Sequence, residues 1–463
     1  MNTPAIAASR MQSMAHDRLL PLILRLALPS VIGVTVSAAY QFLNAYFVGR
    51  LGTAALAAMA LSFPFAMCIT AIGQIFGAGA ASLIARSLGR ADDHSANDYA
   101  SHALWLAMVI AGIAAIAGWL AAPSLLAWLR AGPSTLPLAV AYLHWLLLGY
   151  VAVVFNMVCG FIVRADGNTV LSMTTQVSSF AMNAALDPVM IFWLGLGIEG
   201  AGIATFLAQL CGLTLYWRHF AGRHGAIVLS WPSVGRCWCR LASIARIGIP
   251  PALNTLLAVA AMSMLNGFAA RYGEASVAAI GLASRLAMLA VLPLYGLCSG
   301  AQSVVGFNVG AGNWTRVARV VRTMVAVALT FAGVYAGWVV WQARTIIGWF
   351  AHESATIEIG SRAIVLFHCA LPVLGVQQVC LLFMQAKGDA IWATLVAVLR
   401  HGVFLMPLMA LLQQAFGQDG LLFSVAAADM AAGLIAIVIL YSEMRQIDKI
   451  SRLCQVNGMG AVE

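Results

Sequence analysis

The sequence predicts an all-α polytopic membrane protein with twelve transmembrane helices, built as two parallel six-helix repeats. Hydrophobic residues make up 62% of the 463-residue chain and charged residues only 9%. The mean hydropathy of +0.91 lies far above the range of soluble domains. Apolar segments of about 20 residues, the length that spans a bilayer, recur along the whole chain. The chain also repeats itself at an offset of 221 residues.

The repeat relates the first half of the chain to the second almost without gaps. Pro29 recurs as Pro250, and Gly79 as Gly300. The same offset relates further pairs, namely Arg50 and Arg271, Gly52 and Gly273, Ser82 and Ser303, Gly89 and Gly310, Trp128 and Trp349, and Gly167 and Gly388. A register held from residue 29 to residue 167 predicts two homologous lobes. Pro29 lies early in the first helix of its lobe, where proline bends a helix, so it acts either as a hinge or as a fixed kink.

Twelve spans follow from the apolar segments, at residues 20–48, 54–84, 98–122, 137–163, 168–194, 198–218, 242–270, 276–305, 318–342, 359–385, 389–414 and 420–444. Continuous apolar runs such as residues 103–122 exclude a β-barrel. Six spans return the chain to its starting side, so the repeats are parallel and leave a cleft for alternating access. The chain then divides into a cytoplasmic N-terminal segment (1–19), an N-lobe (20–218), a cytoplasmic linker (219–241), a C-lobe (242–444) and a cytoplasmic tail (445–463).

The positive charges set the predicted orientation. Of the 25 Lys and Arg residues, 18 fall on one side of this topology and five on the other. The positive-inside rule therefore places both termini in the cytoplasm, in a multi-pass protein of the plasma (inner) membrane. The net charge of +9 is then a topological signal with some contact to membrane lipid, and no nucleic acid partner is expected. The protein is expected to be monomeric.

The fifth expected span carries the clearest candidate for ion binding. Ser179, Asn183 and Asp187 are spaced by four residues, which places them on one helix face, and Pro188 frees a backbone carbonyl of the preceding turn. A charged group in the hydrocarbon core costs at least about 2.5 kcal/mol, so it requires a reason. These oxygen ligands suit a proton or Na⁺, and no other metal is expected. The alternative is a buried acid whose neighbours only steady the kink.

A second group of ionisable residues falls in the C-lobe. Counting about 1.5 Å per residue places its members near the membrane midplane; they are Arg285, His368, Arg400, His401 and Asp429. Arg400 and Asp429 lie at matching depth in consecutive helices, which predicts a structural salt bridge. The alternative is a substrate or proton-relay site, in which His368 or His401 carries protons.

No enzyme activity is expected. The sequence has no plausible Ser/His/Asp set, no Walker-type nucleotide loop and no zinc motif such as H-E-x-x-H. Without a nucleotide loop, the energy for transport comes from an ion gradient, about 2.3 kcal/mol per charge for each 100 mV. No cofactor is expected, and the coupling ion is H⁺ or Na⁺.

Several motifs, taken in order, resemble the multidrug and toxic compound extrusion (MATE) family. They are Phe47-Val-Gly-Arg-Leu-Gly52 with Ala54-Ala-Leu-Ala-Ala58, Arg164-Ala-Asp-Gly-Asn168, Leu186-Asp187-Pro188, Gly197-Ile-Glu-Gly-Ala-Gly-Ile-Ala-Thr205 and Gly306-Phe-Asn-Val-Gly-Ala-Gly-Asn313. The resemblance covers nearly the full chain. It implies a secondary active efflux antiporter with two six-helix lobes in a V. Such a protein exports small organic compounds, such as drugs, toxins or a secondary metabolite, in exchange for H⁺ or Na⁺.

The resemblance also implies roles for single residues. Asn183 and Asp187 match the fifth-helix pair of the family's cation site, Thr205 matches its sixth-helix threonine, and Tyr142 matches a nearby tyrosine. Pro29 matches a first-helix proline that is linked to bending in the family.

One position departs from the family's pattern. Asn44 stands where the family commonly has Asp, so the predicted site holds one carboxylate, Asp187, in place of two. The identity and number of the coupling ions therefore stay open.

A lipid-linked saccharide flippase of the same broad superfamily is the alternative function. Such carriers move anionic pyrophosphate lipids, for which Arg285 and Arg400 would be suitable ligands. The motifs favour the extrusion family.

Overall fold

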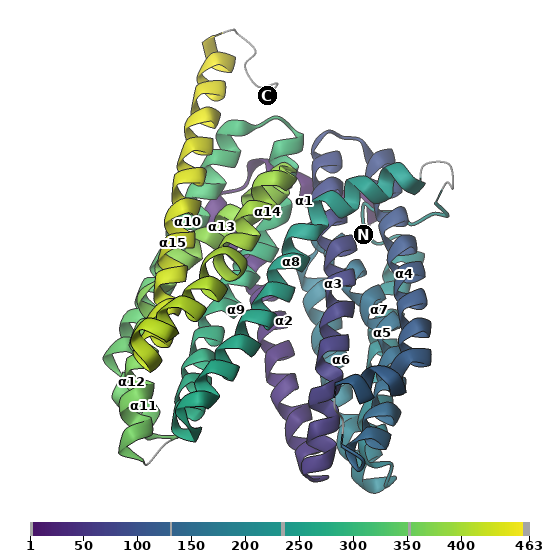
Figure 1. Ribbon diagram of the computed structural model, residues 1–463. Coiled ribbons are helices and arrows are strands. Elements are labelled where there is room, and N and C mark those ends of the chain that lie inside the picture. The colour runs from purple at the N-terminus through teal and green to yellow at the C-terminus, as the bar shows by residue number, and fades with distance from the viewer. Residues whose placement is uncertain (1–2, 130–131, 233–236, 351–352, 457–463) are drawn as a thin grey trace. The chain divides into compact units, whose positions relative to one another are not determined.

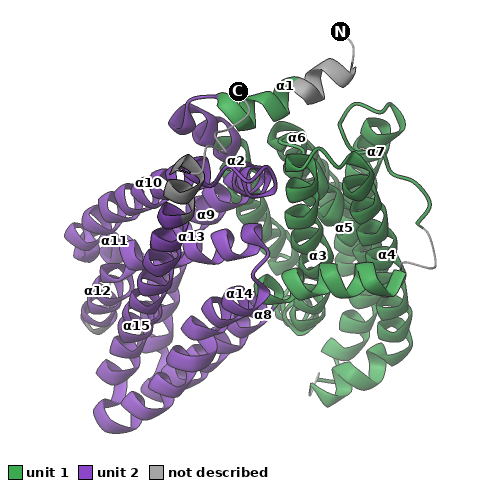
Figure 2. Cartoon of the chain, turned by 90° about the horizontal axis from the view of Figure 1, so that it is seen from above, with its two compact units in different colours: residues 1–16, 28–252 green, residues 17–27, 253–463 purple. Residues whose placement is uncertain are grey.

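The computed structural model describes the chain except residues 1–2, 130–131, 233–236, 351–352 and 457–463 (Figure 1). The described residues form helices joined by short loops, with no strand among them. The predicted all-α fold class is therefore confirmed. Contacts divide the chain into two compact units, coloured separately in Figure 2.

Unit 1 comprises residues 1–16 and 28–252. The helices that lie in it wholly or in part are α1 (Thr3–His16), α2 (Leu19–Gly49), α3 (Thr53–Gly89), α4 (Asp93–Trp128), α5 (Thr135–Ala165), α6 (Thr169–Pro188), the π-helix η1 (Val189–Trp193), α7 (Gly197–Ala221) and α8 (Cys237–Ala269). α5 is the central helix of the unit, since 67% of its most apolar stretch is buried.

Unit 2 comprises residues 17–27 and 253–463. After α8 it continues with a 3-10 turn η3 (Ala270–Tyr272), α9 (Glu274–Gly310), α10 (Trp314–Trp341), α11 (Ala343–Gly348), α12 (Ser354–Cys369), α13 (Leu371–Lys387), α14 (Ala390–Val398), the π-helix η4 (Leu399–Leu405) and α15 (Met406–Val456). Its apolar core gathers buried side chains of α8, α9, α12 and α15, among them Leu265, Ile280, Ile364 and Leu421.

The helices account for the twelve expected spans. Nine helices in the described part of the chain are long and apolar enough to cross a membrane, and the bent pair α12 and α13 adds a tenth. The segment from α14 through α15 holds two spans, because the backbone turns at Gly417 with φ 61° and ψ −134°. α6 is too polar to be recognised by hydropathy, yet it has the length of a span. The expected fifth, eleventh and twelfth spans are therefore present.

The repeat is visible in the backbone. Gly52 and Gly273 precede α3 and α9 with φ of 113° and 94°, and Gly167 and Gly388 have φ of 76° and 87°. Glycine adopts these angles without the steric cost that other residues meet. The duplicated glycines are thus turn positions that both repeats need.

The two compact units differ from the predicted lobes at the start of α2 and α8. The lobes at 20–218 and 242–444 follow the order of the spans, whereas the units follow contacts. By contacts, residues 17–27 belong to unit 2 and residues up to 252 belong to unit 1. Both boundaries fall within two residues of a helix proline, Pro29 in α2 and Pro251 in α8.

Candidate functional site

The buried face of α6 is polar along its whole length. Its residues recur every three or four positions and are Thr169, Ser172, Thr175, Ser179, Asn183 and Asp187. α6 begins where the Asn168 side chain accepts a hydrogen bond from the Leu171 N–H at 3.2 Å. Asp187 lies at the other end and has no exposed surface. Ser179, Asn183 and Asp187 thus share the single face that their spacing predicts.

Asn183 links Asp187 to α7. An ionised carboxylate only accepts hydrogen bonds, so the Asn183 amide is oriented with its nitrogen toward Asp187. In this orientation the nitrogen donates to Asp187 Oδ2 at 2.9 Å, and the Asn183 oxygen accepts from the Thr205 backbone N–H at 3.1 Å. The Thr205 hydroxyl donates to the Ala201 carbonyl at 2.9 Å. Thr205 therefore lies beside the pair to which the sequence assigns ion binding.

Tyr40 of α2 completes this group and was not predicted from the sequence. Its hydroxyl lies 2.8 Å from the Asn183 amide nitrogen and also interacts with Thr205. Its ring stacks on Phe180, with 5.0 Å between the ring centroids. Tyr40 and Asn44 are four residues apart, and this spacing on an apolar helix was the available signal.

Asn44 and Tyr142 form the next contact of the cluster. The Asn44 side chain hydrogen-bonds the Tyr142 hydroxyl, which lies close enough to Asp187 to interact with it electrostatically. Both side chains are buried, and Asn44 Oδ1 has no hydrogen-bond partner among the described residues. The structure therefore gathers in one part of unit 1 all five residues predicted for ion coupling, which are Asn44, Tyr142, Asn183, Asp187 and Thr205.

The helix changes form directly after Asp187. Pro188 is the last residue of α6, and the π-helix η1 follows, with the Leu194 N–H donating to the Val189 carbonyl at 2.9 Å. A proline removes one N–H from the helix ladder, and π-turns occur frequently at functional sites. The carboxylate thus lies at the junction of two helix types.

In unit 2, Arg400 and Asp429 form the salt bridge that the sequence predicts. Arg400 Nε donates to Asp429 Oδ1 at 2.6 Å, and Nη2 donates to Oδ2 at 3.1 Å. His401 Nε2 lies 3.3 Å from Arg400 Nη1, and its Nδ1 has no hydrogen-bond partner in the described part of the chain. The two-point contact fixes the geometry of the pair and offsets its charges. Arg400 and His401 both lie in the π-helix η4.

His368 lies at a break in its span, where α12 and α13 meet at 42°. It is fully buried, its Nδ1 lies 2.7 Å from the Ile364 carbonyl oxygen, and its ring lies 5.9 Å from that of Tyr335. The next residue, Cys369, interacts electrostatically with Asp429. His368 is thus adjacent in the chain to a residue that interacts with Asp429, while its own ring lies against Tyr335.

Arg285 differs from the other C-lobe candidates in its exposure. It lies on α9, and its side chain is exposed, whereas those of His368, His401 and Asp429 are buried. The neighbouring Leu286 carbonyl accepts a hydrogen bond from the Tyr335 hydroxyl at 2.9 Å.

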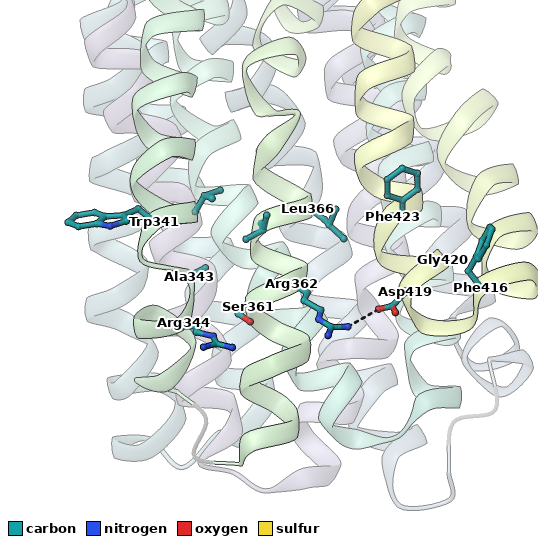
Figure 3. A pocket seen from close by; sticks show the side chains of 12 residues that line it. Trp341, Ala343, Arg344, Ser361, Arg362, Leu366, Phe416, Asp419, Gly420 and Phe423 are labelled. Atoms are coloured by element: carbon teal, nitrogen blue, oxygen red, sulfur yellow. Dashed lines mark ion pairs between the residues drawn. The ribbon is translucent and has the colours of Figure 1, made fainter.

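A separate groove of about 850 Å³ lies in unit 2 between α10, α11, α12 and α15 (Figure 3). Its walls are mostly apolar and include Trp341, Leu366 and Phe423. Arg344 and Arg362 lie along one edge. None of the residues predicted for ion coupling or substrate binding lines this groove, and no motif in the sequence marks it.

The chain matches one family of known proteins over most of its length. The MatE family matches residues 29–189 and 250–411. The two matched segments begin at the offset of the sequence repeat, as expected for a duplicated unit.

Curated relatives match nearly the full chain. The multidrug export protein MepA of Staphylococcus saprophyticus is 25% identical over 416 residues, which cover 90% of this chain and 92% of the relative. The protein of the same name from Staphylococcus aureus is 26% identical over 416 residues, with the same coverage.

Solved structures of transporters superpose on the whole fold. MATE in the bent conformation gives a TM-score of 0.89 at 25% identity and covers 96% of this chain and 99% of that one. A mutant of the MATE transporter VcmN of Vibrio cholerae gives 0.84 at 25% identity, covering 95% and 98%. A MOP superfamily transporter of Pyrococcus furiosus gives 0.84 at 26% identity, covering 92% and 96%. These structures bear out the predicted architecture of twelve helices in two lobes.

Proposed function

The chain belongs to the MatE family, and on that premise we propose that it is a multi-pass membrane transporter that exports several kinds of small organic compound. Full-length relatives named as multidrug export proteins support this function. We propose further that export is driven by exchange for H⁺ or Na⁺ through alternating access, that both termini are cytoplasmic, and that the protein acts as a monomer. No cofactor, enzyme activity or nucleic acid partner is part of this proposal.

The observation that carries ion coupling is the environment of Asp187. Its carboxyl group is fully buried in a membrane-spanning helix, and no described Lys, Arg or His forms an ion pair with it. A buried carboxylate without a cation is costly, so it gains most from binding a proton or Na⁺. Asn183, Thr205, Tyr40 and the Asn44–Tyr142 pair supply the surrounding oxygen and nitrogen atoms. Asp187 is therefore the proposed coupling residue.

The test compares Asp187→Asn with Asp93→Asn in proteoliposomes loaded with an organic dye. Both substitutions remove one carboxylate from unit 1, but Asp93 is exposed in the first turn of α4. Asp187→Asn should abolish dye export driven by an imposed H⁺ or Na⁺ gradient, and Asp93→Asn should retain it. Gradient-driven export at the wild-type rate by folded Asp187→Asn protein would refute the proposed role.

The flippase alternative receives no support from the geometry. It depended on Arg285 and Arg400 as ligands for an anionic pyrophosphate headgroup, and the Arg400 guanidinium is paired with Asp429. The C-lobe residues Arg400, His401, Asp429 and His368 are better suited to a structural role or to proton relay than to binding a pyrophosphate. We propose them as a second candidate site, after Asp187, for proton relay.

A further inference from the structure

The polar face of α6 continues well beyond the proposed ion site. From Asn183 it runs through Ser179, Thr175 and Ser172, each at most 5% exposed, toward the start of α6. At this end Asp166 lies 3.7 Å from Arg10 of α1, measured from Oδ2 to Nη1. This is the end of unit 1 that is predicted to be cytoplasmic. A buried polar stripe therefore joins Asp187 to that end of the unit.

Neighbouring helices add polar side chains halfway along the stripe. A Cβ at Gly212 of α7 would lie 2.6 Å from Ser179 Oγ and 2.7 Å from Asn156 Nδ2. Asn156 Nδ2 donates to Gln209 Oε1 at 2.8 Å, while its buried Oδ1 accepts no hydrogen bond from the described residues. The glycine leaves room for Ser179, Asn156 and Gln209 to form one polar group between α5, α6 and α7.

A second polar group follows nearer the start of α6. A Cβ at Gly160 of α5 would lie 3.0 Å from the Tyr216 hydroxyl and 3.4 Å from Ser172 Oγ. Arg164 Nη1 donates to Ser172 Oγ at 2.6 Å. Thr175 Oγ1 lies within reach of the Tyr216 hydroxyl but completes no well-formed hydrogen bond within the described chain. Gly160 thus opens space for a hydroxyl cluster, as Gly212 does for the amide cluster.

We infer that this stripe is a proton path between Asp187 and the cytoplasmic end of the N-lobe, an inference that rests on the proposed coupling role of Asp187. Hydroxyl groups both accept and donate hydrogen bonds, so a row of them passes a proton by exchanging partners. Buried polar atoms with spare hydrogen-bonding capacity are the atoms that bind internal water, and Asn156 Oδ1 and Thr175 Oγ1 have such capacity. The path therefore holds one acceptor or donor on each turn of α6.

The packing favours a proton over Na⁺ in this path. A sodium ion needs several oxygen ligands at every stop, with room for its own radius. The contacts around Gly212 are too close to admit even one added carbon atom without a shift of Ser179 or Asn156. Hydrogen-bond exchange requires no such space.

Two adjacent threonines of α6 provide a matched test. Thr175 faces the path, whereas Thr174 is exposed and its hydroxyl donates to the Leu171 carbonyl at 3.0 Å. Thr→Val keeps the shape and removes the hydroxyl. In proteoliposomes, Thr175→Val should slow proton-driven dye export by about a hundredfold, the low end of what a positioned proton-transfer group contributes. Thr174→Val should export at the wild-type rate. Ser179→Ala provides a second variant within the path.

Infrared difference spectra separate failure of the path from failure of the site. The carboxyl band that Asp187→Asn removes should still titrate in Thr175→Val, because the site itself is intact. Equal export by the two threonine variants would overturn the path and leave the role of Asp187 untouched. Loss of the Asp187 band in Thr175→Val would also overturn it, since the effect would then lie in the site. Export by Asp187→Asn would overturn the coupling role instead.

The groove in unit 2 supports a second inference, which does not depend on ion coupling. Along the groove of Figure 3, Arg344, Ser361 and Arg362 lie at one edge, and Leu366 and Phe423 lie above them. In Figure 1 this edge is near α11, at the end of unit 2 opposite the C-terminal end of α15. Arg362 is paired with Glu358 at 2.8 Å and with Asp419 at 3.6 Å. Arg344 is exposed and forms no ion pair within the described residues. One edge of the groove thus offers an uncompensated guanidinium.

The geometry points to a phospholipid in this groove, with its phosphate on Arg344 and an acyl chain along the apolar wall. A guanidinium matches a phosphate with two parallel hydrogen bonds. Apolar walls that continue from that charge toward the middle of the helices match the order of head and tail in the outer leaflet. Charge and polarity along the groove therefore both agree with a lipid, whereas a soluble anion would use Arg344 alone.

Native mass spectrometry of the purified full chain, loaded with phosphatidylglycerol, tests this site. Arg344→Gln should weaken lipid retention by about three- to tenfold, the effect of losing one exposed charge-assisted contact. Arg271→Gln is the matched control, since Arg271 is exposed in the turn η3 that precedes α9 and lies outside the groove. Val365→Trp, which fills the groove without changing charge, should weaken retention as well. Equal retention by the two glutamine variants, or displacement of the lipid by inorganic phosphate, would overturn the assignment.

Discussion

Asn44 decides how much negative charge surrounds the proposed ion. It hydrogen-bonds Tyr142, which interacts electrostatically with Asp187, so a carboxylate at position 44 would face the same small volume. Asn44→Asp should therefore shift the ion preference of export toward Na⁺, which gains from added carboxylate oxygen. Dye export measured against separate H⁺ and Na⁺ gradients checks this. Asn44→Ala keeps one carboxylate and should keep the wild-type preference; identical profiles for Asn44→Asp and wild type would contradict a shared site.

Asp166 gives the protein a predictable response to pH outside the membrane. Burial raises the pKa of Asp166 from 3.8 to about 6, while the Ala226 N–H and the Arg10 guanidinium act in the lowering direction. The folded state therefore holds this proton more tightly than the unfolded state. The free energy of unfolding falls as pH rises from about 4 to about 6, by about 3 kcal/mol from this group. The loss is complete above about pH 6.

The Asp166→Asn variant isolates that contribution. The amide oxygen can still accept the Ala226 N–H, but the side chain cannot ionise. Asp166→Asn should unfold at a higher temperature than wild type at pH 7.5, and the difference should vanish near pH 4. Thermal unfolding in detergent at both pH values measures this. Asp93→Asn, which alters an exposed acid, should follow the wild-type curve. A constant difference across this range would contradict the assignment.

At the scale of residues, the sequence identified the polar groups whose positions follow from spacing. Ser179, Asn183 and Asp187 share a face because they are four apart, and Arg400 meets Asp429 because their depths match. Tyr40 could not be predicted from the sequence, because its ring is apolar and only its hydroxyl joins the site. Asn156 and Gln209 of the proposed path could not be predicted either. Their contact joins α5 and α7, and the spacing of residues along one helix does not tell which residue of another helix packs against it.

At the scale of elements, Gly417 separates the last two spans. Its φ of 61° and ψ of −134° lie in a region that is essentially restricted to glycine. Gly417→Ala should lower the free energy of unfolding by about 1–3 kcal/mol. Gly333→Ala in α10 is the control, since a Cβ there would meet nothing within 4 Å and alanine favours the helix. Thermal unfolding compares the two; equal stability would show that the turn tolerates a side chain.

Hydropathy predicted where the spans begin and end, but it did not predict the π-helices or the break within a span. The expected span at 168–194 agrees with α6 and η1, and that at 359–385 lies within α12 and α13. The π-helices η1 and η4 and the 42° break near Ala370 have no signal in apolar content, because hydropathy averages over about 20 residues. Pro188 and Pro372 mark two of these places only indirectly. The irregular turns carry Asp187, His368, Arg400 and His401 at or near them.

At the scale of the whole molecule, the duplication extends to residues whose identity has changed. The N-caps of α4 and α10 are Asp92 and Asn313, which are related by the repeat offset, and each accepts a bond from the N–H three residues on. Asn168 and Asp389 cap α6 and α14 in the same way. Asp and Asn serve equally as caps, so a search for identical residues misses these pairs. The N-cap hydrogen bond is therefore duplicated even where the residue type has changed.

The duplicated glycines Gly79 and Gly300 hold the first turns of α8 and α2. A Cβ at Gly79 would collide with the Ile244 carbonyl oxygen within unit 1, and a Cβ at Gly300 would collide with the Leu26 carbonyl oxygen within unit 2. Small residues permit such backbone contact between membrane helices. Residues 17–27 lie in the first half of the chain but pack in unit 2, and the start of α8 up to residue 252 lies in the second half but packs in unit 1. Each unit therefore depends on a segment from the other half of the sequence.

Gly79→Ala and Gly300→Ala should each lower the free energy of unfolding by about 1–3 kcal/mol, the usual cost of forcing a carbon atom into a packed contact. Because the two contacts lie in different units, the double variant should lose the sum of the single losses. Gly281→Ala in α9 is the control, since its Cβ would meet nothing within 4 Å. Thermal unfolding in detergent measures all four proteins. If Gly300→Ala were as stable as Gly281→Ala, the Leu26 contact would not hold the first turns of α2, and the duplicated glycine would need another explanation.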